Sequence, residues 1–295
     1  MVVTQVENNM ISIKKDKKYL VTGGSGFLGA KVIEKILSQG GKVVTISRDE
    51  GKLIELKQKF PEVEFYTGDV CDPFDVHQAM RGVTGVFHLA AFKHVGIAED
   101  LVRECTRSNI TGSLNILEEG VKHNVEFVVG ISTDKAAQVA GVYGASKYIM
   151  ERLFEQFERN YPDIMFRVVR YGNILYSTGS VLCKWKDLLI EGKEVVVTDP
   201  TATRFFWTID QAVDLIWDSL EKAGSSKPYV PEMKSISIRD LLTAMSEKYL
   251  PEGKELCIKE IGLQQGENLH EKILEDGPSS DEADKYTIAQ IKGMI

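Results

Sequence analysis

The stretch that most constrains the fold is a glycine-rich turn between an apolar run and an amphipathic segment. Residues 19–22 (Tyr-Leu-Val-Thr) have the character of a buried strand, and apolar residues recur at helical spacing over 32–37. Glycines permit a tight turn between such elements, and the following helix N-terminus presents free N–H groups to a pyrophosphate. A tight turn that holds no ligand is the competing interpretation. The turn residues expected to bind a dinucleotide are Gly23, Ser25, Gly26, Phe27, Leu28 and Gly29.

Strand-like and helix-like segments then alternate along the chain. Buried-strand patterns occupy 43–46, 64–66, 85–91, 127–131 and 166–170. Helical spacing covers about 98–123, the segment that ends near Arg159, and 210–222. This alternation predicts an α/β fold, a doubly wound parallel Rossmann sheet with a smaller C-terminal α/β substrate lobe.

The alternation of strands and helices also predicts where the domains begin and end. We expect the dinucleotide-binding domain to span residues 18–175 plus about 206–224, where a helix returns to the sheet. The substrate lobe would then comprise about 176–205 and 225–295. Residues 1–17 are polar and aperiodic, which predicts a flexible N-terminal arm.

Composition narrows the partners. The net charge of −7 over 295 residues argues against a nucleic-acid or anionic-membrane surface. No apolar run reaches the ~18 residues of a membrane span. The four cysteines form no C-x-x-C pair, which suits reduced thiols and a cytoplasmic location. The five histidines show no metal-ligand spacing, so we expect no metal site.

The end of the second predicted strand bears on the choice of cofactor. An acidic side chain at this point binds the ribose 2′-OH of NAD, whereas an arginine accommodates the 2′-phosphate of NADP. Ser47 and Arg48 come first here, which favours NADP over NAD. Two alternatives are that Asp49 turns back to the ribose and that Arg48 is merely solvated. After the third strand, Asp69 and Val70 are placed for the adenine.

The fourth predicted strand ends in small residues, Ala90 and Ala91, which would let a cofactor lie close. His88 within this strand is interpreted as a packed core histidine. Lys93 follows at the mouth of the expected site. Asn109 lies on the next predicted helix, as either an interior amide or a support for the active site.

Candidate chemistry gathers after the strand at 127–131. Asp134 and Lys135 follow it directly, at the strand end where open α/β sheets place their active sites. Tyr143 and Lys147 are four residues apart near the start of a helix, so they share one face. A nearby ammonium lowers a phenol pKa from its usual value of about 10. The pair is therefore predicted to supply a base near neutral pH.

Together these motifs resemble the extended short-chain dehydrogenase/reductases, which bind nicotinamide cofactors and act mostly on nucleotide-sugars. Within that group, the chain more closely resembles the UDP-N-acetylglucosamine 4,6-dehydratases of polysaccharide and flagellin-sugar pathways. The resemblance covers roughly residues 18–275. It rests on blocks at 47–50, 90–95, 132–136, 143–147, 169–173, 203–205 and 266–271.

The resemblance implies roles for these residues. Tyr143, assisted by Lys147, would remove the sugar 4-OH proton while NADP takes the C4 hydride. Asp134 and Lys135 would handle the C5 proton and the departing C6 hydroxyl, and the hydride would return to C6. Members of this type tend to invert C5 as well. Further residues implied at the site are Thr133 for catalysis, Ser132, Asn109, Tyr171 and Asn173 for the cofactor, and Lys93, Asn173, Val181, Thr198, Arg204 and Glu267 for the nucleotide-sugar substrate.

The chain departs from the family pattern at three places. Thr178 stands where an arginine is usual, and Tyr176 replaces a glycine. Residues 264–268 read Gln-Gln-Gly-Glu-Asn in place of Arg-Pro-Gly-Glu-Lys. Two positions expected to bind the diphosphate are therefore neutral, which leaves Arg204 as the main candidate.

Two other functions compete with dehydration. A nucleotide-sugar 4-epimerase or reductase would keep Tyr143 and Lys147 without needing Asp134 and Lys135. A non-catalytic NADP sensor would have no use for these four residues. We also expect a dimer or a larger homo-oligomer, because the helix at 144–159 is apolar on more than one side.

Overall fold

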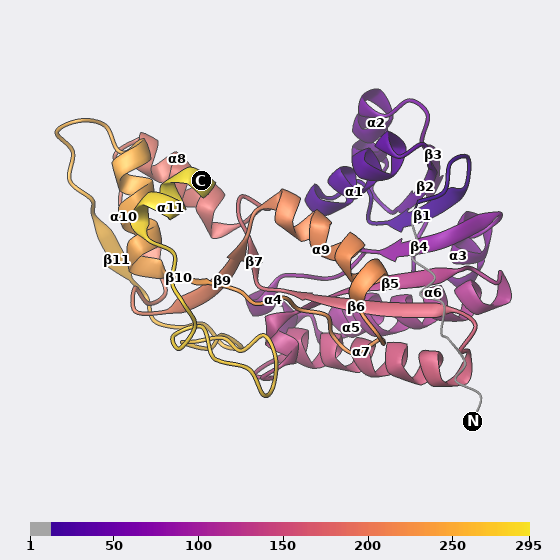
Figure 1. The fold of residues 1–295 in the computed structure, drawn as a ribbon. Helices are drawn as coiled ribbons and strands as arrows, with labels where there is room; N and C mark the ends of the chain where they lie inside the picture. The colour runs from indigo at the N-terminus through magenta and orange to yellow at the C-terminus, as the bar shows by residue number, and fades with distance from the viewer. Residues whose placement is uncertain (1–12) are drawn as a thin grey trace.

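The computed structural model describes residues 13–295 and contains a six-stranded parallel sheet (Figure 1). The strands lie in the order β3-β2-β1-β4-β5-β6, so the direction of winding reverses between β1 and β4. Ligands of open α/β sheets bind at such a reversal, beyond the carboxyl ends of the strands. The strands are β1 (Lys18–Thr22), β2 (Lys42–Ser47), β3 (Glu64–Thr67), β4 (Val83–His88), β5 (Phe127–Thr133) and β6 (Met165–Tyr171).

Helices cover both faces of this sheet, which confirms the doubly wound α/β prediction. Central strands such as β1 and β5 are apolar on both sides, because each side packs against a helical layer. One layer comprises α1 (Phe27–Ser38), α2 (Glu50–Lys59) and α9 (Ile209–Lys222). The other comprises α3 (Pro73–Ala79), α6 (Gly112–Lys122) and α7 (Val142–Asn160).

The segment expected to form one long helix over 98–123 is broken. It consists of α4 (Val95–Asp100), α5 (Val102–Thr106), a π-helical turn (Arg107–Thr111) and α6. Leu101 has φ −108° and ψ 50°, outside the helical region, and this residue separates α4 from α5. The prediction of a single helix was wrong because helical periodicity does not register such local breaks.

The C-terminal lobe has its own core, built from α8 (Val181–Ile190), α10 (Ile238–Tyr249) and two small sheets. In Figure 1 this lobe lies beside the main sheet, while α9 runs between the two parts. Thr208 and Gln211 form a capping box that starts α9 as the chain leaves the lobe. The remaining elements are β7 (Asn173–Ile174), β8 (Val195–Val197), β9 (Thr203–Trp207), β10 (Ser235–Ser237), β11 (Ile258–Glu260) and α11 (Ile288–Met294).

The N-terminal prediction is only partly open to comparison, because residues 1–12 lie outside the described residues. Residues 13–17 are not a loose arm: Ile13 is buried, and the Lys14 backbone N–H donates to the Tyr19 hydroxyl at 2.8 Å. Lys14 also pairs with Glu126. Within residues 13–295, no helix combines the length and apolar character that a bilayer crossing needs.

Candidate active site

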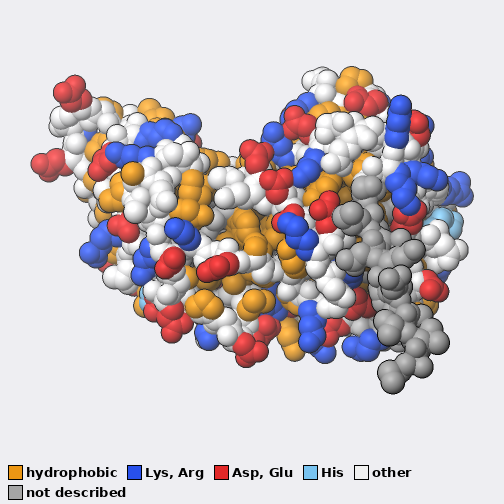
Figure 2. Space-filling model, in the orientation of Figure 1, with side chains coloured by type: hydrophobic (Ala, Val, Ile, Leu, Met, Phe, Trp, Pro, Cys, Tyr) orange, Lys and Arg blue, Asp and Glu red, His pale blue; other side chains and the backbone are white. Residues whose placement is uncertain are grey.

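A cavity of about 770 Å³ lies at the carboxyl edge of the sheet and extends toward the C-terminal lobe. Figure 2 shows the surface hollowed between these two parts, with charges of both signs interspersed on the face in view. The volume lies in the range of small-molecule and cofactor sites. The predicted site residues that line the cavity are Gly23, Ser25, Gly26, Phe27, Leu28, Gly29, Ser47, Arg48, Asp69, Val70, Ala90, Ala91, Lys93, Ser132, Thr133, Asp134, Lys135, Tyr143, Lys147, Tyr171, Asn173 and Val181.

The glycine-rich turn has the geometry of a phosphate cradle. Gly23 has φ +68°, a conformation that L-residues rarely adopt. A Cβ on Gly29 would lie 2.3 Å from the Gly23 carbonyl oxygen, so only glycine lets α1 start this close to the turn. The N-cap of α1 is Gly26, and no side chain caps the helix. The first N–H groups of α1 are therefore available to an anion, which fits a dinucleotide pyrophosphate.

Asp49 and Arg48, the acidic and basic candidates for contact with the cofactor ribose at the end of β2, have different surroundings. The Asp49 carboxylate caps α2, accepting from the Lys52 backbone N–H at 3.0 Å. Arg48 is exposed and lines the cavity. Asp69 accepts a hydrogen bond from the Cys71 backbone N–H at 3.0 Å and pairs with Arg107 at 3.3 Å. Of the two charged candidates Arg48 and Asp49, Arg48 is thus the one that lines the cavity.

The fourth strand carries His88, and its interpretation as a packed core histidine is confirmed. His88 is buried, with Nδ1 2.8 Å from the Thr22 hydroxyl and Nε2 3.0 Å from the Ser113 hydroxyl. Burial, and then the charge of Lys147, lowers the pKa of His88 to about 3. The ring is therefore neutral at physiological pH.

Tyr143 and Lys147 both reach the cavity from the first turns of α7, but their electrostatics differ from the prediction. Burial raises the pKa of Tyr143 to about 12, although the Thr133 hydroxyl and the Lys135 ammonium act in the opposite direction. The Lys147 ammonium donates to the Ile131 carbonyl at 2.7 Å, and burial lowers its pKa to about 8. A base at neutral pH does not arise from this pair alone, because desolvation outweighs the neighbouring charges.

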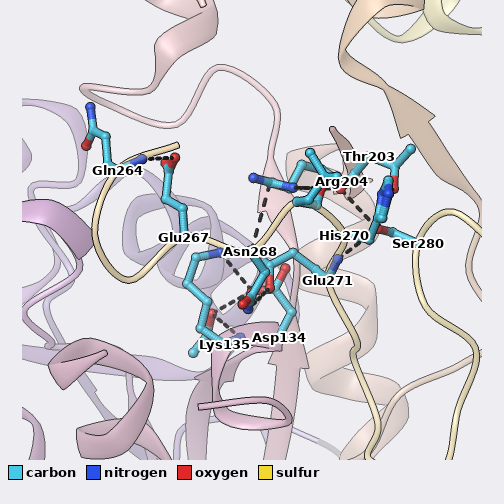
Figure 3. A network of polar contacts seen from close by, with 12 residues as sticks. Asp134, Lys135, Thr203, Arg204, Gln264, Glu267, Asn268, His270, Glu271 and Ser280 are labelled. Atoms are coloured by element: carbon cyan, nitrogen blue, oxygen red, sulfur yellow. Dashed lines mark hydrogen bonds and ion pairs between the residues drawn. The ribbon is translucent and has the colours of Figure 1, made fainter. Parts of the chain in front are cut away.

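A buried ionic cluster lies at the end of β5 (Figure 3). The Lys135 ammonium is 3.2 Å from Asp134 Oδ1 and 3.2 Å from Glu271 Oε1. Asp134 Oδ1 also accepts from the Thr133 hydroxyl at 3.0 Å. Burial lowers the pKa of Lys135, but the two carboxylates outweigh this and the net shift is upward. Glu271 was missed as a site residue; it lay within the recognised block 266–271, where only Glu267 was chosen.

Behind the cavity, Arg170 connects the sheet to the C-terminal segment. Arg170 Nε and Nη2 donate to the two oxygens of Glu151 at 2.7 and 2.6 Å, with both side chains almost fully buried. Arg170 also donates to the Ile273 carbonyl at 3.0 Å and to Glu275 at 2.8 Å. The Ser132 hydroxyl donates to Glu151 at 2.5 Å, so Ser132 reaches the cavity with its hydroxyl already bonded.

Four predicted site residues do not line the cavity. Asn109 supports the wall instead, because its amide bonds both the N–H and the carbonyl of Phe92 at 2.8 and 3.0 Å. Arg204 is buried and donates to the Thr203 and Leu269 carbonyls. Glu267 accepts from the Gln264 backbone N–H at 3.2 Å, which fastens its own turn. Thr198 lies outside the cavity wall.

Two residues at the cavity have side chains that are already bonded. The Lys93 ammonium donates to the Thr178 carbonyl at 2.9 Å, so it links the sheet domain to the lobe. Burial lowers the pKa of Lys93. The Tyr171 hydroxyl donates to the Ala212 carbonyl of α9. The Tyr171 hydroxyl is therefore already bonded within the fold.

One further cluster was not visible in the sequence. His77 of α3 meets Glu119 of α6 and His123, the residue that caps the end of α6, with one ligand-type atom from each within 4.8 Å of the others. The sequence indicated no metal-ligand set, because residue 77 is far from the pair at 119 and 123 along the chain. Packing of α3 on α6 brings the three together.

The sheet order, the glycine cradle at the reversal point and the Tyr143–Lys147 pair define an extended short-chain dehydrogenase/reductase. The sequence profile of the polysaccharide biosynthesis protein family matches residues 19–292, and the chain belongs to that family. The resemblance drawn from the sequence is thereby confirmed.

Known proteins of two activities are similar to this chain. A UDP-N-acetylglucosamine 4,6-dehydratase (inverting) of Campylobacter jejuni is 35% identical over 271 residues, which are 89% of this chain and 79% of the relative. A UDP-glucose 4-epimerase of Rickettsia akari is 32% identical over 282 residues, 92% of this chain and 82% of the relative. The crystal structure of Pen from Bacillus thuringiensis superposes with a TM-score of 0.90 at 27% identity, covering 96% of this chain and 98% of that one.

Proposed function

We propose that this chain is a nucleotide-sugar 4,6-dehydratase, a lyase that acts on a UDP-N-acetylglucosamine-like substrate and recycles its nicotinamide cofactor. The observation that carries the proposal is that Asp134, Lys135, Tyr143 and Lys147 all face one cavity beside the glycine cradle. The Campylobacter relative is named as inverting, and inversion at C5 is part of the proposal.

Each of these residues has a task that matches its position. In the proposed reaction, Tyr143 accepts the proton of the sugar 4-hydroxyl, and Lys147 holds the start of α7 against β5 through the Ile131 carbonyl. The oxidised nicotinamide, when bound, supplies a hydride acceptor and a positive charge. Such a charge favours the phenolate, which the pKa of about 12 for Tyr143 otherwise disfavours. Asp134 and Lys135 then serve the C5 proton and the C6 hydroxyl.

The Rickettsia relative makes 4-epimerisation the second candidate. Epimerisation needs hydride removal and return at C4, with no proton transfer at C5. At the cavity wall, Asp134 is buried and forms an ion pair with Lys135, whose side chain is only 13% exposed, an expensive arrangement for residues without a chemical task. This pair favours dehydration.

Turnover of UDP-N-acetylglucosamine in heavy water distinguishes the two reactions. A dehydratase gives a product that has lost one water and carries one deuterium at C5, without net formation of NADPH. An epimerase gives a product of unchanged mass. If another nucleotide-sugar gives the dehydration signature, only the substrate assignment fails. If no nucleotide-sugar loses water, the dehydratase proposal is wrong.

We further propose NADP as the cofactor in preference to NAD. Arg48 faces the cavity, while the competing Asp49 carboxylate is engaged as the cap of α2. A guanidinium provides charge-assisted hydrogen bonds to a phosphate, and an occupied carboxylate is less available to a ribose hydroxyl.

We also propose self-association and a cytoplasmic location. Tyr148 and Ile149 are each 42% exposed on α7, beside the exposed Ile97 and Val102 of α4 and α5. Helices that bury one apolar face and expose another favour a dimer or higher assembly. The four cysteines, all within the described residues, are free, as in reducing compartments. Light scattering at micromolar concentration should show at least a dimer, which Ile149→Glu should weaken; a monomeric wild type would contradict this.

A further inference from the structure

The C-terminal lobe contributes a carboxylate to the Lys135 cluster, and nothing in the proposed chemistry so far uses it. Glu271 is fully buried, and its Oε1 lies 3.2 Å from the Lys135 ammonium (Figure 3). The backbone holds Glu271 in place, since its N–H donates to the Ser280 hydroxyl at 2.9 Å and its carbonyl accepts from the Ser280 N–H at 2.8 Å. These two hydrogen bonds fix the position of Glu271 beside Lys135.

The cluster contains three charged neighbours of Lys135. Asp134 and Glu271 are the two carboxylates, Arg204 Nε lies 4.0 Å from Glu271 Oε1, and the Tyr143 phenol is the remaining titratable neighbour. Because two carboxylates surround it, Lys135 rests as an ammonium. An ammonium has no lone pair, so Lys135 cannot take the C5 proton before it loses one of its own.

The two carboxylates differ as acceptors of that proton. Asp134 Oδ1 already accepts from the Thr133 hydroxyl as well as from Lys135, which stabilises its anionic form. Each carboxylate has one oxygen that accepts no hydrogen bond among the described residues, Asp134 Oδ2 and Glu271 Oε1. Glu271 Oε1 forms the ion pair with Lys135, and Oε2 accepts from the Asn268 amide at 3.1 Å. Burial and the charge of Asp134 also raise the pKa of Glu271. The carboxylate of Glu271 therefore accepts one hydrogen bond and that of Asp134 accepts two, so protonation of Glu271 disturbs fewer contacts.

We propose that Glu271 is a positioning residue that accepts a proton from Lys135 and so prepares the lysine as the base for C5. In the first step, the Lys135 N–H bond breaks and a Glu271 O–H bond forms, which leaves a neutral amine and a neutral carboxylic acid. The amine then takes the C5 proton and becomes an ammonium again. That proton leaves with the C6 hydroxyl as water, and Glu271 returns its proton to Lys135. The inference rests on the proposed dehydratase function.

The test compares kcat against pH for the wild type, Glu271→Gln and Glu271→Asp, with Glu282→Gln as the control. Glu282 is an exposed acid in the same C-terminal segment that caps the Ser279 N–H. Glu271→Gln keeps the shape but cannot take a proton, so Lys135 must lose its proton to solvent. We expect kcat of this variant to be at least about 100-fold low near neutrality and to rise with pH, with KM little changed.

The outcomes separate the inference from the function. Glu271→Asp should restore part of the activity and flatten the pH profile, and Glu282→Gln should match the wild type. An active wild type with a pH-independent loss in Glu271→Gln would overturn the inference alone, since a purely structural defect has no reason to follow the protonation of Lys135. A wild type that releases no water from any nucleotide-sugar would overturn both.

A second inference rests on a separate place, the contact of α3 with α6. His77 Nδ1 lies 2.8 Å from Glu119 Oε2, His123 Nε2 lies 3.2 Å from His77 Nδ1, and His123 Nε2 lies 3.7 Å from Glu119 Oε2. Two ligands of a tetrahedral zinc ion are ~3.3 Å apart when each bond is about 2.0–2.1 Å. The three atoms thus already form a triangle of suitable size.

The two ring nitrogens also leave a place that a cation could fill. Protons on both nitrogens would face each other across 3.2 Å, whereas a divalent ion would accept a lone pair from each of the three atoms. The Lys122 ammonium holds the other oxygen, Glu119 Oε1, at 2.7 Å, which turns Oε2 toward the imidazoles. We propose that His77, Glu119 and His123 bind one Zn²⁺-type transition-metal ion that bridges α3 and α6.

Calorimetric titration of the chelator-treated chain with zinc sulfate tests this site. We expect saturable binding of one ion, weakened by about 10–100-fold in both His77→Ala and His123→Ala, as typical of losses at a zinc site. His94→Ala is the control, because His94 is an exposed histidine of the sheet domain outside this cluster. Absence of saturable binding, or equal binding by all three variants, would overturn the proposal.

Discussion

The carboxyl edge of the sheet and the C-terminal lobe contribute to one site, but they were predictable to very different degrees. At the sheet edge, the glycine turn, Arg48, Asp134 and Tyr143 all reach the cavity as expected. From the lobe, Val181 lines the cavity as expected, but Thr198, Arg204 and Glu267 do not. Glu271 joins the ionic cluster although it was not predicted as a site residue. A parallel sheet delivers whatever follows each strand to one edge, while the lobe has no comparable rule.

The variant with the largest expected effect removes Lys135, which lies at the carboxyl edge of the sheet. Lys135→Ala should abolish water loss, a reduction in kcat of about 100–10,000-fold if the lysine acts in proton transfer. Cofactor binding should persist, because the glycine cradle is untouched. Product mass and the absorbance of the bound cofactor measure the two effects. Unchanged dehydration would remove Lys135 from the chemistry.

Tyr143→Phe provides the matched comparison for that variant. It should block the reaction before elimination, so that no transient reduction of the cofactor is seen. Lys135→Ala should still permit that reduction. Identical transients in both variants would contradict the assignment of separate steps.

The next prediction concerns the connection between the two regions. Arg170→Ala leaves Glu151 buried without its charged partner, which should lower the free energy of unfolding by about 3–5 kcal/mol. Urea denaturation measures the change. Arg152→Ala is the control, because Arg152 is 53% exposed and its pair with Glu155 should be worth no more than about 1 kcal/mol. Equal losses in the two variants would show that burial of the Arg170–Glu151 pair does not determine its contribution to the free energy of unfolding.

The next prediction concerns cofactor binding at the carboxyl edge of the sheet. Arg48→Ala should weaken NADP binding by about 1.5–3 kcal/mol, the loss of a charge-assisted hydrogen bond, and leave NAD binding nearly unchanged. Equilibrium titration with each oxidised cofactor measures this. Equal weakening of both would rule out contact of Arg48 with the 2′-phosphate.

The prediction with the smallest expected effect concerns Tyr176 of the C-terminal lobe. Tyr176 has φ +54°, in the left-handed region, where the family has a glycine. Its hydroxyl lies 2.9 Å from that of Tyr249, so direct replacement by glycine mixes two effects. Tyr176→Gly should nevertheless be more stable than Tyr176→Ala by about 1 kcal/mol, the reverse of the usual order, because a Cβ is disfavoured at this φ. Thermal denaturation of the two variants provides the measurement.

The sequence by itself determined the α/β class, the strands that build the sheet, and most of the residues along its carboxyl edge. It could do so because strand patterns and the residues that directly follow them are local, and parallel strands end together. It also identified the family, through blocks spread over most of the chain.

Only the tertiary structure decided which charged residues lie together and how their pKa values shift. The pKa of Tyr143 rises because burial outweighs its cationic neighbours, and burial is not encoded in the Tyr-x-x-x-Lys spacing. Glu271 reaches Lys135, and His77 reaches Glu119, across long separations in sequence that only packing closes. Long-range electrostatics depends on distance and desolvation in the folded chain, and both are properties of the assembled structure.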